Sequence, residues 1–421
     1  MAFHPPALEF QGHEPLIFQG LARVLRDPTL HWPPSILDRS AVRARAGATR
    51  IALLASPRAV NEVLLNRGGV FPRARLHDRI LGVAYGENLV RGDRADWRRQ
   101  RREITQPFRP EQMLTLAPRI RLACDRLLAE WAEQPAGQPV DIVRDTRRFA
   151  LDSLWRCFFC DDGAALAVEP MVEDVALAMD AHHDAPLVGH LKDLRPLAHL
   201  ARGRGSPALE ADPAAGGDES QDLNTLLLFL HAGHDNVTAT LTWALWLLAH
   251  HPDLQAAIRR EWRATLSQPD IAGLDLPAHP LTGAVVRETL RLYPPIMHLI
   301  RDAKADVEVD GERIEAGFTA VLSLYAMHRN RQWWEDPDAF RPERFLGEGD
   351  EAKRRTVWLP FGAGPRGCIG ASFAQLELTL AIGMIVSRFE LAPNPGHGLD
   401  CRVDFVLRPE GRDAMLLRAL A

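Results

Sequence analysis

The sequence has little of what a secreted or membrane-embedded protein needs. Only five of its 421 residues are cysteines, and an odd, sparse set argues against a disulfide framework and for a reducing compartment. The first residues, MAFHPPALEFQGHEPLIFQ, contain no apolar run flanked by basic residues. We therefore expect neither a signal peptide nor a membrane anchor, and we predict a cytoplasmic protein.

Lysine is rare, and acidic residues outnumber basic residues only slightly, by 55 to 50. Lys192, Lys304 and Lys353 are the only lysines, and every other basic residue is arginine. We interpret this as compositional bias, so a cluster of arginines alone does not indicate a binding site. The net charge is −5, which favours neither a nucleic acid nor a membrane surface as partner. The sequence also lacks a flavin domain and a glycine-rich nucleotide fingerprint.

The composition is that of a globular enzyme, with 46% hydrophobic and 25% charged residues. A chain of this length can bury a large core and still enclose a cofactor. Apolar residues at helical spacing predict helices, the longest of them apolar nearly all round and therefore buried. The expected helices cover residues 57–66 after a Ser56 cap, 95–105, 113–133, 140–160, 223–250, 281–292 and 370–388.

A smaller number of segments have the pattern of strands. Residues 307–309 and 313–314 should form a hairpin around a type I′ turn at Asp310-Gly311. Further strands are expected at 49–54 and 319–324, the latter continuing the sheet, and as a C-terminal hairpin of 403–407 with 414–417. We predict a mainly α fold with a small β part, a single domain over 1–421, and a mobile loop at 203–221, which is rich in glycine, proline, alanine and acid.

The chemistry-bearing feature is a cysteine in a glycine-rich loop, Phe361-Gly-Ala-Gly-Pro-Arg-Gly-Cys368-Ile-Gly370, that precedes the last helix. Glycines let the backbone pass close to a flat ligand, while loop N–H groups, the helix N-terminus and Arg366 favour a thiolate over a thiol. A lone thiolate is a metal ligand or a nucleophile, and no Cys or His partner stands at zinc spacing. From residue types alone, a glycine-rich turn with a buried cysteine is about equally plausible.

The loop resembles the signature of the cytochrome P450 family, Phe-x-x-Gly-x-Arg-x-Cys-x-Gly, at five positions: Phe361, Gly364, Arg366, Cys368 and Gly370. The resemblance implies a single large helical domain with a minor β-rich subdomain. It also implies that Cys368 ligates the iron of haem b, and that Phe361 and Arg366 contact the haem.

Other segments resemble the family in the same order along the chain. Glu288-x-x-Arg291 and Pro342-Glu-Arg344-Phe match two family elements, which implies that Glu288, Arg291 and Arg344 form a buried charge trio. Without the resemblance, Glu288 and Arg291 would be interpreted as a surface pair of little energetic value. Trp97, Arg101 and Arg301 match positions that contact the haem propionates, although Trp97 could also be plain core.

The sequence Ala232-Gly233-His234-Asp235 resembles the central helix of the family, where small residues leave room for dioxygen. The family usually continues with threonine, and this chain has Asn236 instead. Thr238 cannot substitute, because two residues rotate a side chain by about 200° around a helix. Asp235 and Asn236 are the expected catalytic residues, and an amide can hold water but cannot relay a proton as a hydroxyl does.

Segments that match the family's pocket are apolar and indicate a lipophilic small-molecule substrate. They are Phe229, Ala232, Ile296, Leu299, Ile300, Phe405 and Val406. His298 lies beside them with its role open. Cys157 and Cys160 have redox spacing but lie late in an apolar helix, so we interpret them as core residues.

The resemblance implies a monooxygenase that consumes O2 and draws NAD(P)H electrons from a separate donor, most simply a ferredoxin with its reductase. Two other functions stay open. One is a peroxide-driven peroxygenase, to which Asn236 gives weak support, and the other is a haem-binding sensor or scaffold without turnover.

Overall fold

The structure is a computed structural model, and it describes residues 3–12, 16–18, 32–75, 97, 101–102, 105, 108–135, 137–158, 219–268, 271, 274–347, 356–404 and 406–420. The chain forms two compact units, each assembled from separated segments. Unit 1 contains Met1–Asp78, Ala284–Cys368 and Leu399–Glu410, and unit 2 contains Arg79–Gly283, Ile369–Gly398 and Gly411–Ala421. The expectation of a single domain over 1–421 stays a prediction.

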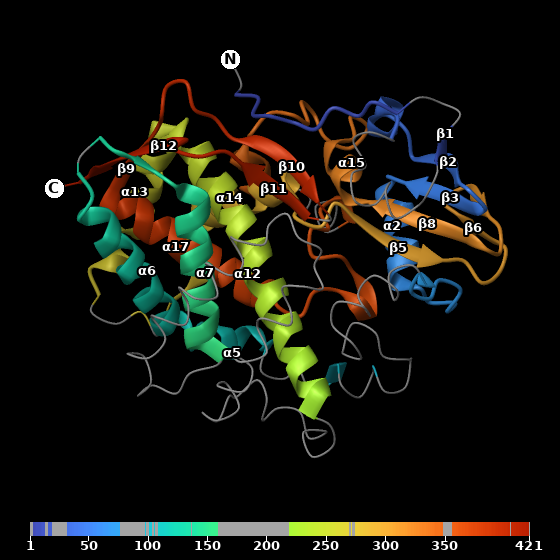
Figure 1. Cartoon of the computed structure of the whole chain (residues 1–421), viewed down its shortest axis with the longest axis horizontal. Coiled ribbons are helices and arrows are strands. Elements are labelled where there is room, and N and C mark those ends of the chain that lie inside the picture. Colours follow the sequence, from blue (N-terminus) through green and yellow to red (C-terminus); the bar gives the residue numbers. More distant parts are fainter. Residues whose placement is uncertain are drawn as a thin grey trace. The chain divides into compact units, whose positions relative to one another are not determined.

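Unit 1 is built on a five-stranded mixed sheet (Figure 1). Its order is β1 (Leu16–Phe18), β2 (Ala41–Ala46), β3 (Thr49–Leu54), β8 (Phe318–Ser323) and β5 (His298–Asp302). Every residue of β8 is buried, as suits a strand between two neighbours. Helix α2 (Pro57–Leu65) follows β3 and begins at Ser56, whose hydroxyl accepts a hydrogen bond from the Ala59 N–H. The predictions for residues 49–54 and 57–66 are confirmed.

The predicted hairpin is present as β6 (Val307–Val309) and β7 (Glu312–Ile314), and positive φ angles at Asp310 (49°) and Gly311 (77°) confirm the type I′ turn. The expectation that the next strand continues this sheet is wrong, because β8 pairs with β3 and β5 instead. The remaining elements of unit 1 are η2 (Pro34–Leu37), α15 (Leu324–Arg329), η7 (Pro342–Phe345), η8 (Gly364–Arg366), β10 (Asp400–Asp404) and β11 (Val406–Glu410).

Unit 2 is a helical bundle around α12 (Glu219–Ala249), a helix of 31 residues that packs against α7 (Ile142–Phe158) and α17 (Ala371–Arg388) (Figure 1). The predictions of helices at 223–250 and 370–388 are confirmed, and from Val237 to Ala249 every residue of α12 is buried. Its other elements are α5 (Pro110–Leu114), α6 (Ala117–Ala132), β4 (Pro139–Val140), α13 (Pro252–Leu266), η6 (Leu276–Ala278), β9 (Phe389–Pro393) and β12 (Met415–Ala419). Helix α14 (Pro280–Leu292) starts at the end of one chain segment of unit 2 and continues in unit 1.

Two expected boundaries are wrong. The helix expected at 113–133 is two helices, α5 and α6, because Pro118 has no N–H to bond the Leu114 carbonyl. The loop expected at 203–221 ends earlier, since α12 begins at Glu219, and residues 203–218 lie outside the described part. Of the helix expected at 95–105, only Trp97, Arg101, Arg102 and Thr105 are described, and all four are helical.

The expected C-terminal hairpin is also wrong. Residues 403–407 do not form one strand, because β10 and β11 pair with each other, with Asp404 opposite Val406. Strand β12 pairs with β9, with Leu417 opposite Leu391, and with β4. The buried Met415 and Leu391 place this sheet against the apolar core of unit 2, so burial selects a partner distant in sequence.

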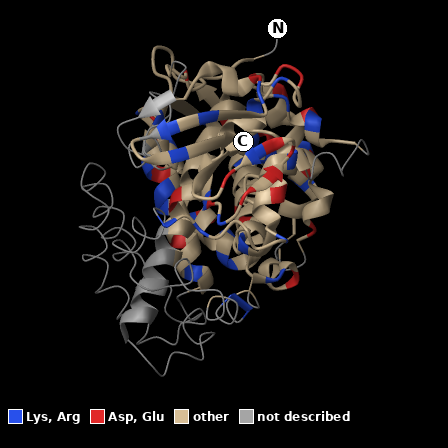
Figure 2. Cartoon of the chain, turned by 90° about the vertical axis from the view of Figure 1, so that its right-hand side faces the viewer, with Lys and Arg blue, Asp and Glu red and all other residues tan. Residues whose placement is uncertain are grey.

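On the side of the molecule that Figure 2 shows, charged residues do not separate by sign. Figure 2 shows basic and acidic residues interspersed over the described elements, and exposed ion pairs such as Arg50–Glu315 and Arg331–Asp38 account for several of them. Within the described residues, no helix is both long enough and apolar enough to cross a membrane.

The core of unit 2 holds a fully buried glutamate that the sequence did not single out. Glu377 on α17 is fully buried, and neither of its carboxylate oxygens has a hydrogen-bond partner in the part of the chain that is described. Desolvation raises the pKa of Glu377 from 4.5 to about 8, and the hydroxyl of Ser153 on α7 opposes the shift without cancelling it.

We predict that Glu377 makes stability fall as the pH rises from about 4.5 to about 8, because in this window the folded state keeps a proton that the unfolded state loses. The effect is at most about 1.4 kcal/mol for each pH unit. Glu377→Gln should flatten this dependence, measured as urea-unfolding midpoints at both ends of the window. Glu315→Gln, at an exposed ion pair, is the control and should leave the slope as in wild type. Equal slopes for wild type and Glu377→Gln would contradict the prediction.

Candidate functional site

The loop that carries Cys368 is held in one shape by its own backbone. Gly362 and Gly364 have φ angles of 67° and 70°, a region that side chains with a Cβ rarely adopt. A Cβ on Gly364 would also collide with the Leu64 carbonyl of α2, so glycine permits the loop to pack against this helix. The Cys368 N–H donates to the Phe361 carbonyl at 2.9 Å, and Cys368 itself is exposed. The cysteine is therefore presented on a rigid loop from which it can reach a ligand.

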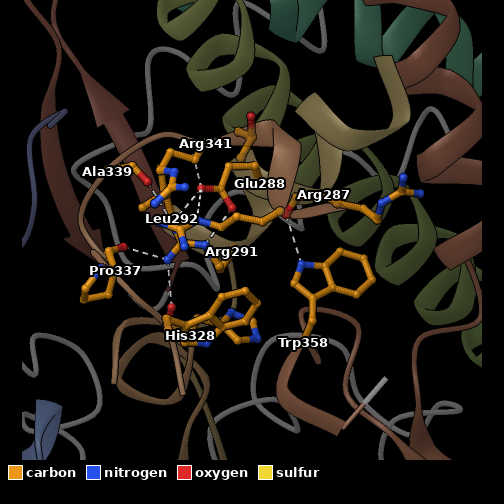
Figure 3. Close-up of polar contacts among 12 residues, drawn as sticks. Arg287, Glu288, Arg291, Leu292, His328, Pro337, Ala339, Arg341 and Trp358 are labelled. Atoms are coloured by element: carbon orange, nitrogen blue, oxygen red, sulfur yellow. Dashed lines mark hydrogen bonds and ion pairs between the residues drawn. The ribbon is translucent and has the colours of Figure 1, made fainter. Parts of the chain in front are cut away.

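Unit 1 also contains a fully buried ion pair (Figure 3). Arg291 donates from Nε and Nη2 to the two carboxylate oxygens of Glu288, both at 2.7 Å. The other N–H groups of Arg291 donate to the carbonyls of His328, Pro337 and Ala339 at 2.7–3.0 Å. All five guanidinium N–H groups are used, which is the condition under which a buried arginine is tolerated.

Arg344 on η7 completes the trio that the sequence predicts. Its Nε lies 3.3 Å from Oε1 of Glu288, and its Nη2 donates to the Asp336 carbonyl. The same Oε1 also accepts a hydrogen bond from the backbone N–H of Arg341 at 2.9 Å, a contact that no sequence pattern indicates. The structure thus brings Glu288, Arg291 and Arg344 together, with the carboxylate of Glu288 shared among them.

A second group of arginines in unit 1 lies beside strand β5. Arg301 is on this strand opposite Arg73, and its Nη1 donates to the Ile300 carbonyl at 2.8 Å. Burial and the nearby positive charge of Arg366 lower the pKa of Arg301 to about 10. Like charges brought together in a buried place fit an anionic ligand, and two propionate carboxylates are such a ligand. The residues present therefore fit a haem.

The residues expected to face dioxygen lie on α12 in unit 2. Asp235 is buried and Ala232 is exposed. The side-chain Nδ2 of Asn236 donates to the Ala232 carbonyl at 2.9 Å, and its Oδ1 is buried with no donor among the described residues. Thr238 is buried, and its hydroxyl donates to the His234 carbonyl, so it does not stand in for the missing threonine.

Close packing explains the glycine in this segment. A Cβ on Gly233 would lie 2.8 Å from Leu154 of α7, so glycine allows the two helices to approach. In the same unit, Trp97 is buried in a cluster with Phe108, Phe229 and Ile369. The rings of Phe108 and Phe229 are stacked with centroids 5.8 Å apart. Arg101 lies one turn after Trp97, and its carbonyl accepts a hydrogen bond from the Thr105 hydroxyl.

The residues expected in the substrate pocket are dispersed over several elements. Ile300 and Val406 are buried, whereas Phe229, Ile296 and Leu299 are partly buried, and Phe405 lies outside the described residues. Leu299 lies next to the cysteine loop, since a Cβ on Gly362 would be 3.5 Å from its Cδ1. His298 meets Trp32 edge-on at 5.8 Å, and burial lowers the pKa of its imidazole to about 4, so it is neutral at pH 7.

Cys157 is a core residue. It is buried, and desolvation, followed by the nearby Glu377 carboxylate, raises the pKa of its thiol well above 9. A thiol of this kind is unreactive. Cys160 lies outside the described residues.

The helical bundle, the small sheets, the cysteine loop and the buried trio together define the class of haem-thiolate proteins. Comparison with known proteins agrees, because the family model "Cytochrome P450" matches residues 39–179 and 218–415. The chain belongs to the cytochrome P450 family, whose members are haem-dependent monooxygenases of the oxidoreductase class.

Individual relatives have the same family name or activity. The chain is 30% identical to cytochrome P450 734A5 of Oryza sativa subsp. japonica, with 89% of this chain and 78% of the relative covered. It is 27% identical to pentalenene oxygenase of Streptomyces avermitilis, with 89% of each chain covered. A solved zebrafish cytochrome P450 with progesterone is 23% identical and has a TM-score of 0.74, covering 90% of this chain and 96% of that one, which supports the fold.

We predict that Glu288→Ala destabilises the protein by about 3–5 kcal/mol, because it leaves the charge of Arg291 buried and unpaired. Soluble yield, haem content and the urea-unfolding midpoint should all fall. The control is Asp38→Ala, which removes an exposed carboxylate that accepts two hydrogen bonds from Arg331 and should cost less than about 1 kcal/mol. A well-folded, haem-replete Glu288→Ala protein would show that the pair is dispensable.

Proposed function

We propose that this protein inserts one oxygen atom from O2 into a lipophilic small molecule, using a haem b whose iron is ligated by Cys368. The observation that carries the proposal is the exposed Cys368 on a loop whose backbone is fixed by Gly362, Gly364 and the Cys368–Phe361 hydrogen bond. When bound through a thiolate, haem activates dioxygen, and donation from sulfur favours O–O cleavage.

In this proposal the chain's own residues hold the cofactor at two ends. Cys368 supplies the ligand, and Phe361 and Arg366 lie within the same loop. Arg301, already close to the charge of Arg366, binds a propionate. Placing carboxylates there offsets the repulsion between the arginines, so haem binding should stabilise unit 1.

On the oxygen side, Asp235 and Asn236 organise proton delivery. Asp235 supplies the acid, as the resemblance implies. The Nδ2 of Asn236 is occupied by the Ala232 carbonyl, so Oδ1 is the group that remains to act, and it can only accept a hydrogen bond. We infer that Oδ1 holds a water molecule in the position where the family usually has a hydroxyl.

The substrate is proposed to be lipophilic because the pocket positions are apolar: Phe229, Ala232, Ile296, Leu299, Ile300, Phe405 and Val406. A relative whose name gives pentalenene as its substrate supports the same class. Electrons are proposed to come from NAD(P)H through a separate protein, most simply a ferredoxin and its reductase, in the cytoplasm.

The ligation is tested directly by Cys368→Ala. Wild-type protein that is reduced and treated with carbon monoxide should show the strongly red-shifted Soret band of thiolate ligation, and the variant should lose it. Cys401→Ala is the matched control, since Cys401 is a half-buried thiol in the same unit, and it should keep the band. An unchanged band in Cys368→Ala would refute the ligand assignment.

Variants of Asn236 distinguish the monooxygenase from the second candidate, a peroxide-driven peroxygenase, to which this residue gives weak support. With redox partners and substrate, Asn236→Ala should release more peroxide for each NAD(P)H consumed, whereas Asn236→Thr should stay coupled to product. If Oδ1 instead binds the substrate, both changes should weaken its affinity by about 0.5–1.5 kcal/mol. Faster turnover of the wild type with peroxide alone than with the redox partners would favour the peroxygenase.

A further inference from the structure

His328 connects the buried ion pair to the segment that leads into the cysteine loop. It lies on α15 and is fully buried. Its backbone carbonyl accepts a hydrogen bond from Nη1 of Arg291 at 2.9 Å, as Figure 3 shows. Its ring Nε2 accepts a hydrogen bond from the backbone N–H of Leu359, also at 2.9 Å. One residue therefore contacts both Arg291 and the chain that approaches Cys368.

The path from His328 to Cys368 continues through short backbone hydrogen bonds. The Leu359 carbonyl accepts from the Gly362 N–H at 2.9 Å, which sets the turn at the start of the loop. The Phe361 carbonyl then accepts from the Cys368 N–H at 2.9 Å. Displacement of Leu359 would therefore move the residues that hold the cysteine.

The approach segment is attached at a second point as well. The indole Nε1 of Trp358 donates to the Arg287 carbonyl on α14 at 3.0 Å (Figure 3). Leu359 packs in the same apolar cluster as Leu324 and Met327 of α15. Trp358 thus attaches the segment to the helix of the ion pair, and His328 attaches it to α15. Of the two side chains, His328 acts directly on the backbone N–H of Leu359.

The ring of His328 is in the one state that can make this contact. Burial, and then the positive charge of Arg291, lower the pKa of His328 to about 3, and the charge of Arg329 acts in the same direction. The imidazole is neutral in ordinary buffers, with Nε2 as acceptor and the proton on Nδ1. No acceptor for the Nδ1 proton is present among the described residues. A buried N–H group without an acceptor costs free energy, so the Nδ1 proton of His328 does not explain why a histidine occupies this position. The hydrogen bond that Nε2 accepts from Leu359 does explain it.

We propose that His328 is a positioning residue for the thiolate ligand: by accepting the Leu359 N–H, it keeps the cysteine loop in the geometry that Cys368 needs to hold iron. The proposal rests on the ligation of haem by Cys368. It assigns His328 no contact with haem or substrate. Its effect should appear in the persistence of thiolate ligation and not only in the stability of the fold.

The test follows the conversion of the reduced carbon monoxide complex from the red-shifted Soret band to the band of haem that has lost its thiolate. His328→Phe keeps an aromatic ring but has no acceptor, and it should convert about tenfold faster than wild type. His328→Gln offers an amide oxygen to the Leu359 N–H and should convert at a rate closer to that of wild type.

The matched control is His279→Phe in unit 2. His279 is also buried and stacks on Trp262 with ring centroids 3.9 Å apart, and its ring Nε2 lies 3.2 Å from the Thr265 hydroxyl in a hydrogen bond. This change should lower the unfolding midpoint without accelerating loss of the thiolate in folded protein. Conversion of His328→Phe at the wild-type rate, or equal acceleration by His279→Phe, would overturn the proposal.

If His328→Phe does not load haem, two other measurements test the proposal: the hydrogen-exchange rate of the Leu359 amide in the wild type, and the Soret band of the His328→Gln variant. A Leu359 amide that exchanges as fast as an exposed amide in the wild type contradicts the proposal, and so does loss of the red-shifted band in His328→Gln. Slow exchange together with a retained band supports it. A wild type without the band refutes ligation by Cys368, whereas a normal wild type and an unaffected His328→Phe refute only the role of His328.

Discussion

The architecture of unit 1 depends on the ion pair of Glu288 and Arg291. Neither side chain has any exposed surface, so each charge would be costly without the other. Arg291 also donates to three carbonyls in the chain after α14, those of His328, Pro337 and Ala339. One guanidinium therefore connects the end of α15 to the irregular segment that contains Pro337 and Ala339. That segment precedes the cysteine loop.

The loop itself is governed by a different constraint, the need to bring a backbone close to a neighbouring helix. Gly364 can approach Leu64 of α2 because it has no Cβ, and its φ of 70° excludes most other residues. The ion pair and the glycines thus act on consecutive parts of the chain. The first holds the chain that enters the loop, through His328 and Leu359, and the second shapes the loop around Cys368.

On α12 the chain departs from the usual family pattern without losing a polar group. Asn236 bonds back to the carbonyl one turn earlier, as a threonine can, but its free atom is an acceptor and not a hydroxyl. Asn236 does not disturb the helix, which continues through this residue without interruption. What changes is the polar group that it offers, an amide oxygen in place of a hydroxyl. In the proposed reaction, the proton for dioxygen cleavage would therefore come from water or from Asp235.

Local spacing was sufficient to predict the helices at 57–66, 223–250 and 370–388 and the hairpin at Asp310-Gly311, because periodicity and turn chemistry act over a few residues. It did not predict the pairing of β12 with β9, where burial of Met415 and Leu391 outweighed proximity in sequence. Only the tertiary structure showed that Leu359 donates to His328, that Arg341 donates to Glu288, and that the fully buried Glu377 has no hydrogen-bond partner for its carboxylate oxygens among the described residues. These three depend on which distant segments meet, and hydrogen bonds to backbone atoms leave no signature in residue types.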